Sequence, residues 1–587
     1  MQMNKNTVHI GIIGFGPKGL FGFERLLANL KNLSSGHVHI HLFNSSDKFA
    51  SGWIYDPQQP GYLKMNYPNR LISLEPPCQP ASLCDLQGFS KWQAERKCSS
   101  QENENYTIAS RAEVGAYFLH YFKKLCKGVN PSIKIHKHRL KVKKISKKKK
   151  AYILHTSDEG FESPNFSSLL ITTGHSPSIT SKLSRAAASE NHVPFIYPVD
   201  KQLNAIKAES AVVCKGMGLT AIDAVLALTE GRSGKFETTE KGVTIYKASG
   251  KEPAKIYLYS VSGNPIIPRN ARNTFSQHSF FFKRFVEKIS SFDQLDFETD
   301  LFPFIEKDII GEYYFQLFKK YGEHLNLDQS FSEVQKALAS FHFRYPTVRK
   351  FEPSRLLQPD FDDAFLDEHL KNYWKKWLME IEDQNSPLVA AAQTWKHLSE
   401  DFNRLYSNEC LTPFSKLKFT KLYFPLFNRI AYGPPEINMK KMLALAEGGI
   451  LDFSFAKNPS FHKNEIIKKL EFKTRASKFD FSIDARIPRG YQKTAPVLFT
   501  KSKSVFSFKN DASNENYAHH LKCNKQGNPI NPEGNPEFNI TLYGTPTEGF
   551  LFDNDSLSRT RNDTASLWAQ STAENITLNF KKTQNET

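Results

Sequence analysis

Hydrophobic residues near the start of the chain form short apolar runs that flank a helical stripe. Residues 8–13 are a β-branched run that ends at a glycine, which is typical of a buried strand. From Pro17 onward, Leu20, Phe23 and later apolar residues recur every three or four positions, and another apolar run follows at 37–43. This order predicts a strand, a helix and a second strand, the unit from which parallel sheets are built.

The same order returns near the middle of the chain. Residues 211–215 predict a strand, 219–229 a helix and 256–261 a second strand, and 166–173 is a further apolar run with the length of a buried strand. Two such units predict an α/β fold made of two Rossmann-like dinucleotide-binding domains, each a parallel sheet flanked by helices.

The rest of the chain carries other patterns. Residues 111–125 predict an amphipathic helix, and 275–415 is rich in aromatic residues at helical spacing, which predicts a mostly helical insertion. Residues 133–155 predict two strands around a lysine run, and the polar tail after about 570 is expected to fray. Further strand signals occur at 449–455, 478–485 and 538–543.

Charge and cysteine content narrow the partners. The 587 residues include 78 Lys and Arg against 60 Asp and Glu, a net charge of +18. We interpret the lysine run at 141–150 as a solvated hairpin tip or an edge strand, and we expect no nucleic-acid partner because no nucleic-acid-binding signature accompanies it. The seven cysteines lack CxxC spacing, which argues against a disulfide framework, a zinc site and a dithiol-type reductase.

Hydropathy bears on the compartment. No apolar stretch reaches the ~18 residues that span a bilayer, and no signal peptide is recognised. The sequence therefore predicts a cytoplasmic protein without a transmembrane segment.

A glycine motif joins the first strand to the first helix. It consists of Gly14, Phe15, Gly16, Pro17, Lys18 and Gly19. Gly14 permits a tight turn, Gly16 leaves room for a pyrophosphate, and Gly19 lets the helix approach the strand. The helix N-terminus offers free N–H groups to the phosphates. The motif predicts that this domain binds a dinucleotide, although the second strand ends at Asn44 rather than at the usual acid, with Asp47 as a substitute.

A second motif follows the strand at 211–215. Its candidate contacts are Gly216, Gly218, Leu219 and Thr220. Two motifs about 200 residues apart indicate two nucleotides, and therefore hydride transfer from a nicotinamide to a flavin.

The surroundings of the second motif favour NADP over NAD. The strand at 256–261 is followed by Ser262 rather than by an acid, and Arg232, Arg269 and Arg272 are near in sequence. Arginines suit the 2′-phosphate of NADP, whereas an acid would favour NAD. For at least one of these arginines, a surface salt bridge is the simpler interpretation.

A third candidate lies where the run 166–173 ends. Gly174 lets the chain pass close to a flavin nucleotide, and His175 follows it. We interpret His175 as a turn residue bonded to the backbone, with a proton shuttle as the alternative. No other catalytic residue is identified.

Seven segments carry a family resemblance. They are GFGPKGL (14–20), YDPQQPGYLKMN (55–66), TTGHSP (172–177), YPVD (197–200), GMGLTAIDAVLALTEGRSGKF (216–236), RIAYGPP (429–435) and GTPTEG (544–549). Together they resemble the bacterial FAD-NAD(P)-binding family, which is similar to flavin-dependent N-hydroxylating monooxygenases. The resemblance implies FAD at the first motif and NADPH at the second. It also implies that FAD lies near Trp53, Asn66, Gly544, Thr545 and Glu548.

The resemblance implies a division of the chain and an activity. The FAD-binding domain would use 1–195 and 496–587, the NAD(P)-binding domain 196–274 and 416–495, and the insertion 275–415 would be a substrate lid or a structural cap. The implied enzyme is an FAD- and NADPH-dependent monooxygenase that oxygenates a small amine or amino-acid-like substrate with molecular oxygen through a peroxyflavin, without a metal. The alternatives are a flavin reductase or oxidase without oxygen insertion, and a non-catalytic nucleotide-binding sensor. The sequence carries no signal for an oligomeric state.

Overall fold

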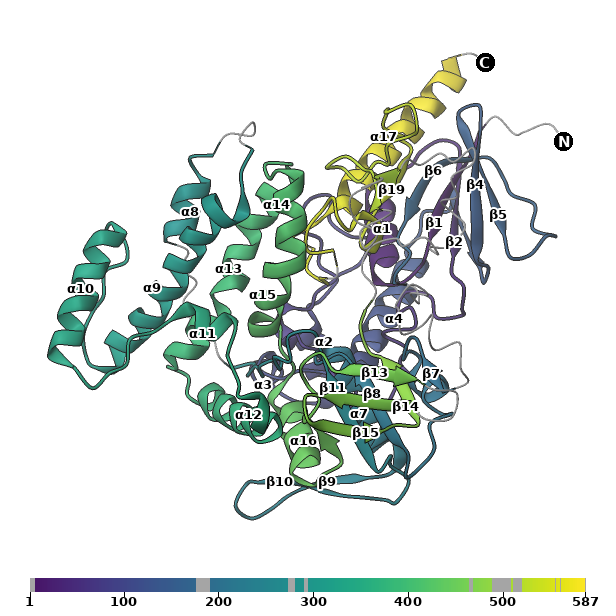
Figure 1. Ribbon diagram of the computed structural model, residues 1–587. Coiled ribbons are helices and arrows are strands. Elements are labelled where there is room, and N and C mark those ends of the chain that lie inside the picture. Colours follow the sequence, from purple (N-terminus) through teal and green to yellow (C-terminus); the bar gives the residue numbers. More distant parts are fainter. Residues whose placement is uncertain are drawn as a thin grey trace. The chain divides into compact units, whose positions relative to one another are not determined.

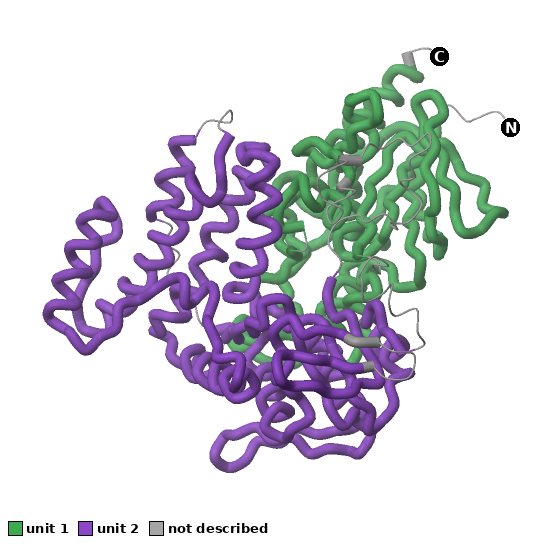
Figure 2. Tube along the Cα trace, in the orientation of Figure 1, with its two compact units in different colours: residues 1–61, 67–181, 488–587 green, residues 62–66, 182–487 purple. Residues whose placement is uncertain are grey.

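The computed structural model, drawn as a ribbon in Figure 1, divides into the two compact units that Figure 2 colours separately. It describes residues 6–175, 191–272, 280–289, 294–463, 468–487, 508–509, 520–554, 556–559 and 561–585. Unit 1 comprises 1–61, 67–181 and 488–587, and unit 2 comprises 62–66 and 182–487. The sequence predicts that the FAD-binding domain is interrupted between 195/196 and 495/496, and the two units divide at 181/182 and 487/488.

Unit 1 is built on a seven-stranded sheet of order β3-β2-β1-β6-β5-β4, with β19 also paired to β6. Its strands are β1 (Thr7–Ile13), β2 (His37–Phe43), β3 (Ile133–His138), β4 (Val142–Lys148), β5 (Ala151–Thr156), β6 (Phe166–Ile171) and β19 (Ile540–Leu542). Strands β3, β2, β1, β6 and β19 run parallel, whereas β4 and β5 form an antiparallel hairpin. The five parallel carboxyl ends therefore meet at one edge of the sheet.

The helices of unit 1 begin where the sequence provides caps. They are α1 (Pro17–Asn29), α2 (Phe89–Lys97), α3 (Gln101–Asn105), α4 (Arg111–Lys127) and α17 (Thr564–Asn585), with short 3₁₀ turns η1 (Asn69–Leu71) and η7 (Thr545–Thr547). Pro17 opens α1, where its missing N–H costs nothing, and Ser110 and Glu113 form a capping box at α4. The frayed tail expected after about 570 is wrong, because α17 packs against α1 and buries Trp568 and Phe580.

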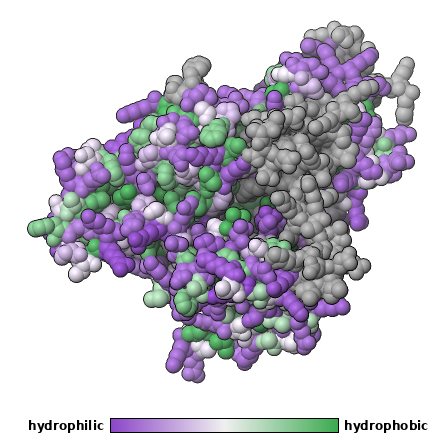
Figure 3. Space-filling model, in the orientation of Figure 1, coloured by the Kyte–Doolittle hydropathy of each residue, from purple (hydrophilic) through white to green (hydrophobic). Residues whose placement is uncertain are grey.

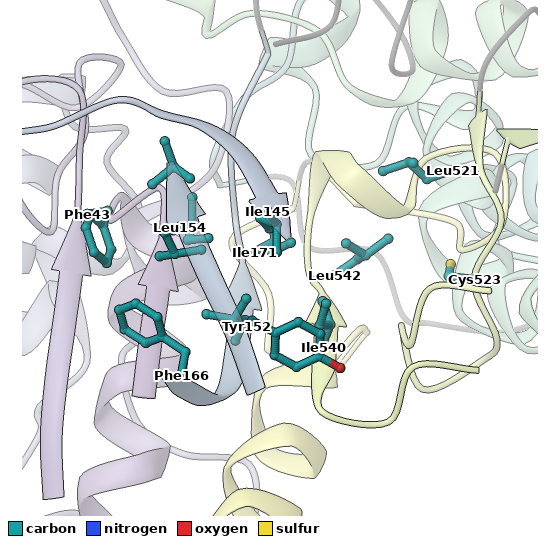
Figure 4. Close-up of a cluster of buried hydrophobic side chains, with 13 residues drawn as sticks. Phe43, Ile145, Tyr152, Leu154, Phe166, Ile171, Leu521, Cys523, Ile540 and Leu542 are labelled. Carbon is teal, nitrogen blue, oxygen red and sulfur yellow. The ribbon is translucent and has the colours of Figure 1, made fainter. Parts of the chain in front are cut away.

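A buried core of unit 1 joins the hairpin and β19 to the parallel strands (Figure 4). Side chains such as Phe43, Tyr152 and Leu542 lie in it, and the Tyr152 hydroxyl donates to Glu537 at 2.9 Å. The region 133–155, predicted as two strands, forms three. The lysine run is the edge strand and hairpin tip that the sequence predicts, because β4 ends the sheet and the turn to β5 contains Lys149 at φ 56°.

Unit 2 is built on a five-stranded sheet of order β12-β11-β8-β16-β7 in which all neighbouring strands are parallel. Its strands are β7 (His192–Val193), β8 (Ala211–Lys215), β11 (Lys255–Tyr259), β12 (Leu451–Asp452) and β16 (Phe481–Asp484). Helix α7 (Leu219–Leu228) connects β8 to β11, which confirms the predicted second unit. Antiparallel additions are β9 (Lys235–Thr238) with β10 (Thr244–Lys247), and β13 (Ser460–Lys463), β14 (Lys468–Phe472) and β15 (Arg475–Lys478).

Helices occupy most of residues 281–447 of unit 2. They are α8 (Phe281–Val286), α9 (Phe302–Lys320), α10 (Phe331–Arg344), α11 (Pro353–Leu357), α12 (Leu366–Glu382), α13 (Pro387–Ser407), α14 (Pro413–Lys418), α15 (Phe424–Ala431) and α16 (Glu436–Glu447), with α6 (Val199–Gln202) earlier. Aromatic residues such as Phe281, Phe318 and Phe341 form a buried cluster there. The mixed α/β architecture with parallel sheets and a helical insertion is thus present, and its helices continue beyond the predicted end at 415.

The surface is largely polar. Figure 3 shows hydrophilic residues over much of the described surface in view, with hydrophobic residues scattered among them. Within the described residues, no helix combines the length and the apolar character that crossing a membrane requires.

Candidate nucleotide-binding sites

The first glycine turn lies at the carboxyl end of β1, between the ends of β2 and β6. The Gly14 N–H donates to the Phe43 carbonyl at 2.9 Å, and Gly14 has a φ of +89°. A Cβ added at Gly14 would lie 2.8 Å from the Thr173 backbone nitrogen. Gly14 is therefore required by the backbone itself, because a side chain would be strained and would collide with the end of β6.

The third glycine of this turn sets the position of α1. A Cβ added at Gly19 would lie 2.9 Å from the Gly14 carbonyl oxygen and 3.1 Å from Thr172 Oγ1, whose hydroxyl donates to the same carbonyl. Phe15 is fully buried against Phe23 and Phe122. These contacts fix the start of α1, at Pro17, directly beyond the end of β1.

The middle glycine, Gly16, is different. Its φ of −93° is ordinary, and an added Cβ would meet its nearest described atom, Gly52 Cα, at 3.9 Å. Packing within the protein therefore does not require glycine here. Gly52 lies in van der Waals contact beside Gly16, and because neither residue has a side chain, a diphosphate can approach the backbone and the first N–H groups of α1.

A late segment of the chain, residues 543–559, reaches this turn through Tyr543 and Gly544. Lys18 Nζ lies 4.6 Å from the centre of the Tyr543 ring and 3.5 Å from its hydroxyl. A Cβ at Gly544, which has a φ of +78°, would lie 3.3 Å from Lys18 Cγ. Thr545 opens the 3₁₀ turn that follows, and the Glu548 N–H donates to the Thr545 carbonyl at 3.1 Å. The structure thus brings Gly544 beside the first motif, with Thr545 and Glu548 in the same turn.

A buried ion network ties this late segment to α1, and sequence reasoning missed it. Glu24 and Arg25 are fully buried and form an ion pair at 2.5 Å, and Arg559 contacts Glu24 at 3.1 Å. Arg559 also donates to the Leu74 carbonyl at 2.7 Å. Charges at consecutive positions of an apolar helix were the available signal, since buried charges occur in pairs.

Three further predicted residues have different environments. Asn44 follows β2, and its amide nitrogen donates to the carbonyls of Ser46 and Lys48 at 3.2 Å, so that it holds its own loop. The Trp53 carbonyl accepts from Gln59 at 2.7 Å, one residue after Gly52. Asn66 belongs to unit 2, where its amide donates to the Tyr432 carbonyl at 3.1 Å, and its place near FAD stays a prediction.

Gly174 and His175 follow β6 and Thr172. Gly174 is exposed, and an added Cβ would meet nothing within 4 Å among the described residues. His175 is half-buried. Both roles weighed for His175, a backbone-bonded turn residue and a proton shuttle, stay predictions.

The second glycine turn repeats the first at the carboxyl end of β8. The Gly216 N–H donates to the Tyr259 carbonyl at 2.8 Å, and Gly216 has a φ of +134°. A Cβ at Gly216 would lie 2.7 Å from the Ala485 carbonyl oxygen. Gly218 has a φ of −106°, and an added Cβ would meet nothing within 4 Å among the described residues. Leu219 and Thr220 open α7, so the helix N-terminus faces this open space.

The arginines proposed for the NADP phosphate are not all at this turn. Arg232 follows the opposite end of α7, and its guanidinium donates to the carbonyls of Leu203, Ile206 and Lys251 at 3.1, 2.6 and 3.0 Å. Arg269 is buried and donates to the Asn66 carbonyl. These bonds join Arg232 and Arg269 to backbone carbonyls of unit 2, and a role of either arginine at the NADP phosphate stays a prediction.

Ser262 and two cations that sequence reasoning missed lie nearer the turn. Ser262 is exposed after β11, and its hydroxyl accepts from the Asn264 N–H at 3.2 Å. Lys457 pairs with Ser260 as a β-bridge and forms an ion pair with Asp363 at 3.2 Å. Arg486 follows β16 and binds Asp484 through two bonds of 2.8 and 2.6 Å, which raise the pKa of Arg486. Only the parallel sheet places these residues at one edge, because they are distant in sequence.

The fold and its two glycine turns define an α/β protein with two dinucleotide-binding sheets. Residues 11–176 match the family described as FAD-NAD(P)-binding, which confirms the predicted resemblance and makes this segment an FAD-NAD(P)-binding domain.

Relatives extend the similarity over most of the chain. The nitrosuccinic acid synthase of Aspergillus oryzae is 24% identical over 76% of this chain and 72% of that protein. The L-aspartate N-monooxygenase (nitrosuccinate-forming) of Streptomyces davaonensis is 22% identical over 77% of each chain. Among solved structures, the L-lysine 6-monooxygenase of Pseudomonas syringae covers 97% of this chain and 99% of its own, with 13% identity and a TM-score of 0.48.

Proposed function

We propose that this chain is an FAD-dependent N-monooxygenase that uses NADPH and molecular oxygen to hydroxylate the amine of an amino acid, with L-aspartate as the first substrate to test. The observation that supports the nucleotide sites is the pair of middle glycines. Gly16 and Gly218 have ordinary φ angles, and an added Cβ would meet no described atom closer than 3.9 Å. A ligand that approaches the backbone explains why both positions are glycine.

Two different nucleotides at the two turns support an oxidoreductase. FAD, when bound, supplies a carrier that accepts hydride from NADPH and reduces oxygen. Gly16 and the first turn of α1 would hold its diphosphate, and Lys18 would add a positive charge beside it. Gly218 and the N-terminus of α7 would hold the diphosphate of NADPH. The protein thus binds and orients the reactants, which requires no metal or nucleophilic side chain.

The substrate class rests on the relatives. Two proteins similar to three quarters of this chain bear names that describe oxygenation of L-aspartate or formation of nitrosuccinate. A chain of net charge +18 also suits an anionic substrate. One hydroxylation would consume one NADPH, one proton and one oxygen molecule, and it would release the N-hydroxy amino acid, NADP⁺ and water.

The coenzyme and the compartment are parts of the same proposal. Ser262 follows β11 at the position where an acid would favour NAD, and Lys457 pairs with Ser260 at the end of the same strand. We therefore propose NADPH over NADH as the coenzyme. All seven cysteines are free, which suits the reducing conditions of the cytoplasm.

The test begins with the absorbance spectrum of the purified chain, reconstituted with FAD if necessary. NADPH and then NADH are added anaerobically, and oxygen is admitted with L-aspartate or with L-alanine, which lacks the side-chain carboxylate. We expect the flavin band to bleach with NADPH and return with oxygen, and L-aspartate alone to gain one oxygen atom by mass spectrometry. Bleaching with peroxide in place of product would establish the reductase or oxidase alternative, and failure to take up FAD would overturn the monooxygenase and favour the non-catalytic nucleotide-binding sensor.

A further inference from the structure

Five histidines gather on one face of the unit 1 sheet, in strands β1, β2 and β3. Side chains at alternate positions of a strand share a face, and the parallel register pairs His9 of β1 with His39 of β2. It also pairs His41 with His136 and Phe43 with His138, so that β3 continues the same row. The segments HVHIHLF and IKIHKH contain this pattern in the sequence.

The imidazole rings of this histidine cluster (His9, His39, His41, His136 and His138) approach one another through their nitrogens. His9 Nδ1 lies 3.0 Å from His41 Nε2, and His41 Nδ1 lies 2.9 Å from His138 Nε2. His39 Nδ1 lies 3.2 Å from His136 Nε2. One nitrogen each of His9, His39 and His41 lies within 4.8 Å of the others, so three possible donor atoms are grouped at one place on the sheet.

We propose that His9, His39 and His41 bind a divalent transition-metal ion of the zinc type. Imidazole nitrogens bind Zn²⁺ at about 2.0–2.1 Å, which places tetrahedral ligands roughly 3.3 Å apart. The spacing of the three donors reaches this geometry with small side-chain movements. The remaining position is left to water or another small ligand.

His136 and His138 are positioning residues for this site. A metal-binding imidazole usually uses its second nitrogen in a hydrogen bond that fixes the ring. His41 has such a partner in His138 and His39 has one in His136, both from the neighbouring strand β3. Phe166 and Phe43 border the cluster with ring centres 5.2 and 6.4 Å from that of His41, so the buried side of the site is apolar.

The surroundings of the cluster are compatible with metal binding. The His41 side chain is buried, and those of His9 and His39 are half-buried. Neutral imidazoles with available lone pairs are the form that binds metal. Lys134 and His37 are the other basic groups that act on His39, and their repulsion would weaken cation binding without preventing it.

The site is separate from the proposed FAD site. His9 precedes Gly14 by five residues of strand, and His41 pairs with Gly11, which precedes Gly14 by three, so the ligands lie about 10–16 Å from Gly14 along the strand at ~3.3 Å per residue. A metal there would join β1 to β2 rather than take part in the flavin chemistry, so its role is structural.

The test uses the full chain without a polyhistidine tag, stripped with a chelator and dialysed. Zn²⁺ is titrated with elemental analysis, and Co²⁺ is used as a visible probe of four-coordinate nitrogen ligation. We expect about one ion per chain and a rise in Tm with added Zn²⁺. Absence of both stoichiometric Zn²⁺ and a tetrahedral Co²⁺ spectrum in the wild-type chain would overturn the proposal.

Variants locate the ion. His9→Gln and His41→Gln should each weaken Zn²⁺ binding at least tenfold, and His136→Gln should weaken it less. His155→Gln is the matched control, because His155 lies exposed on β5 of the same sheet and its Nε2 lies 2.8 Å from the Ser146 hydroxyl. His41 is buried, so if its variant fails to fold, the half-buried His9 provides the result. Unchanged binding in His9→Gln would place the ion elsewhere and overturn the proposal.

Discussion

The two glycine turns are built alike but are surrounded differently. The first glycine is Gly14 in unit 1 and Gly216 in unit 2. In each turn its N–H donates to the last carbonyl of one neighbouring strand, and an added Cβ would collide with the backbone that follows the neighbouring strand on the other side. Around the first turn, Gly52 faces Gly16, and Tyr543 lies against Lys18. Around the second, Gly218 faces open space among the described residues. This difference suits a resident cofactor at the first turn and an exchanging coenzyme at the second.

The largest expected effect comes from Gly16→Val. A valine side chain at position 16 would cover the backbone at the start of α1, where we place the FAD diphosphate. We expect the purified variant to be colourless and to take up no FAD, as measured by the flavin absorbance per chain. Gly61→Val in the same unit is the control, because an added Cβ there meets nothing within 4 Å among the described residues. A yellow Gly16→Val protein with full flavin content would show that FAD is not bound at this turn.

Gly218→Val should act on the other nucleotide alone. The variant should keep its FAD, because its added side chain lies in unit 2 at the start of α7. Overpacking of this size costs about 1–3 kcal/mol, so anaerobic reduction by low concentrations of NADPH should slow about 10–100-fold. Equal loss of flavin in Gly16→Val and Gly218→Val would contradict the assignment of FAD to the first turn and NADPH to the second.

Stability distinguishes the glycines that the backbone requires from those that a ligand requires. In Gly216→Ala the new Cβ would sit at a φ of +134° and 2.7 Å from the Ala485 carbonyl, so urea unfolding should show a loss of about 1–3 kcal/mol. Gly218→Ala should change the free energy of unfolding by less than about 1 kcal/mol, because its Cβ meets nothing. Comparable losses in the two variants would mean that Gly218 also has a structural role, which would remove the argument for a ligand.

The sequence predicts both turns because their signals are local. A strand, three small residues and an apolar helix are contiguous, and the predicted strand 37–43 and the helix beginning at Pro17 agree with β2 and α1. The tail after about 570 was misjudged, since the pattern of Trp568, Ile576 and Phe580 has meaning only once α1 provides a surface to cover.

The chemistry between distant segments could not be predicted in the same way. Arg232 is near Gly218 in sequence, yet α7 carries the chain to the other end of the sheet before Arg232 is reached. Lys457 and Arg486 reach the second turn only through the parallel pairing of β12 and β16. The histidine row required the register of three strands, although each strand shows the alternation on its own.

The smallest expected effect concerns the choice of coenzyme. Lys457 lies beside the turn at Ser260, and it would attract the 2′-phosphate that distinguishes NADPH from NADH. An exposed charge pair of this kind contributes about 0.5–1 kcal/mol, so Lys457→Gln should raise the KM for NADPH roughly 2–5-fold and leave that for NADH unchanged.

The fold provides the control for this prediction. Lys473 also forms an ion pair with Asp363, at 2.5 Å, so the Asp363 carboxylate keeps a cationic partner when Lys457 is replaced. Lys473→Gln is the control, because it removes the other ion pair of Asp363 and leaves Lys457 in place. If Lys457→Gln raises the KM for both coenzymes equally, Lys457 stabilises the turn and does not bind the 2′-phosphate. The preference for NADPH would then have to come from another cation at this edge, and Arg486, bound to Asp484 beside Gly216, is the one that the parallel sheet places there.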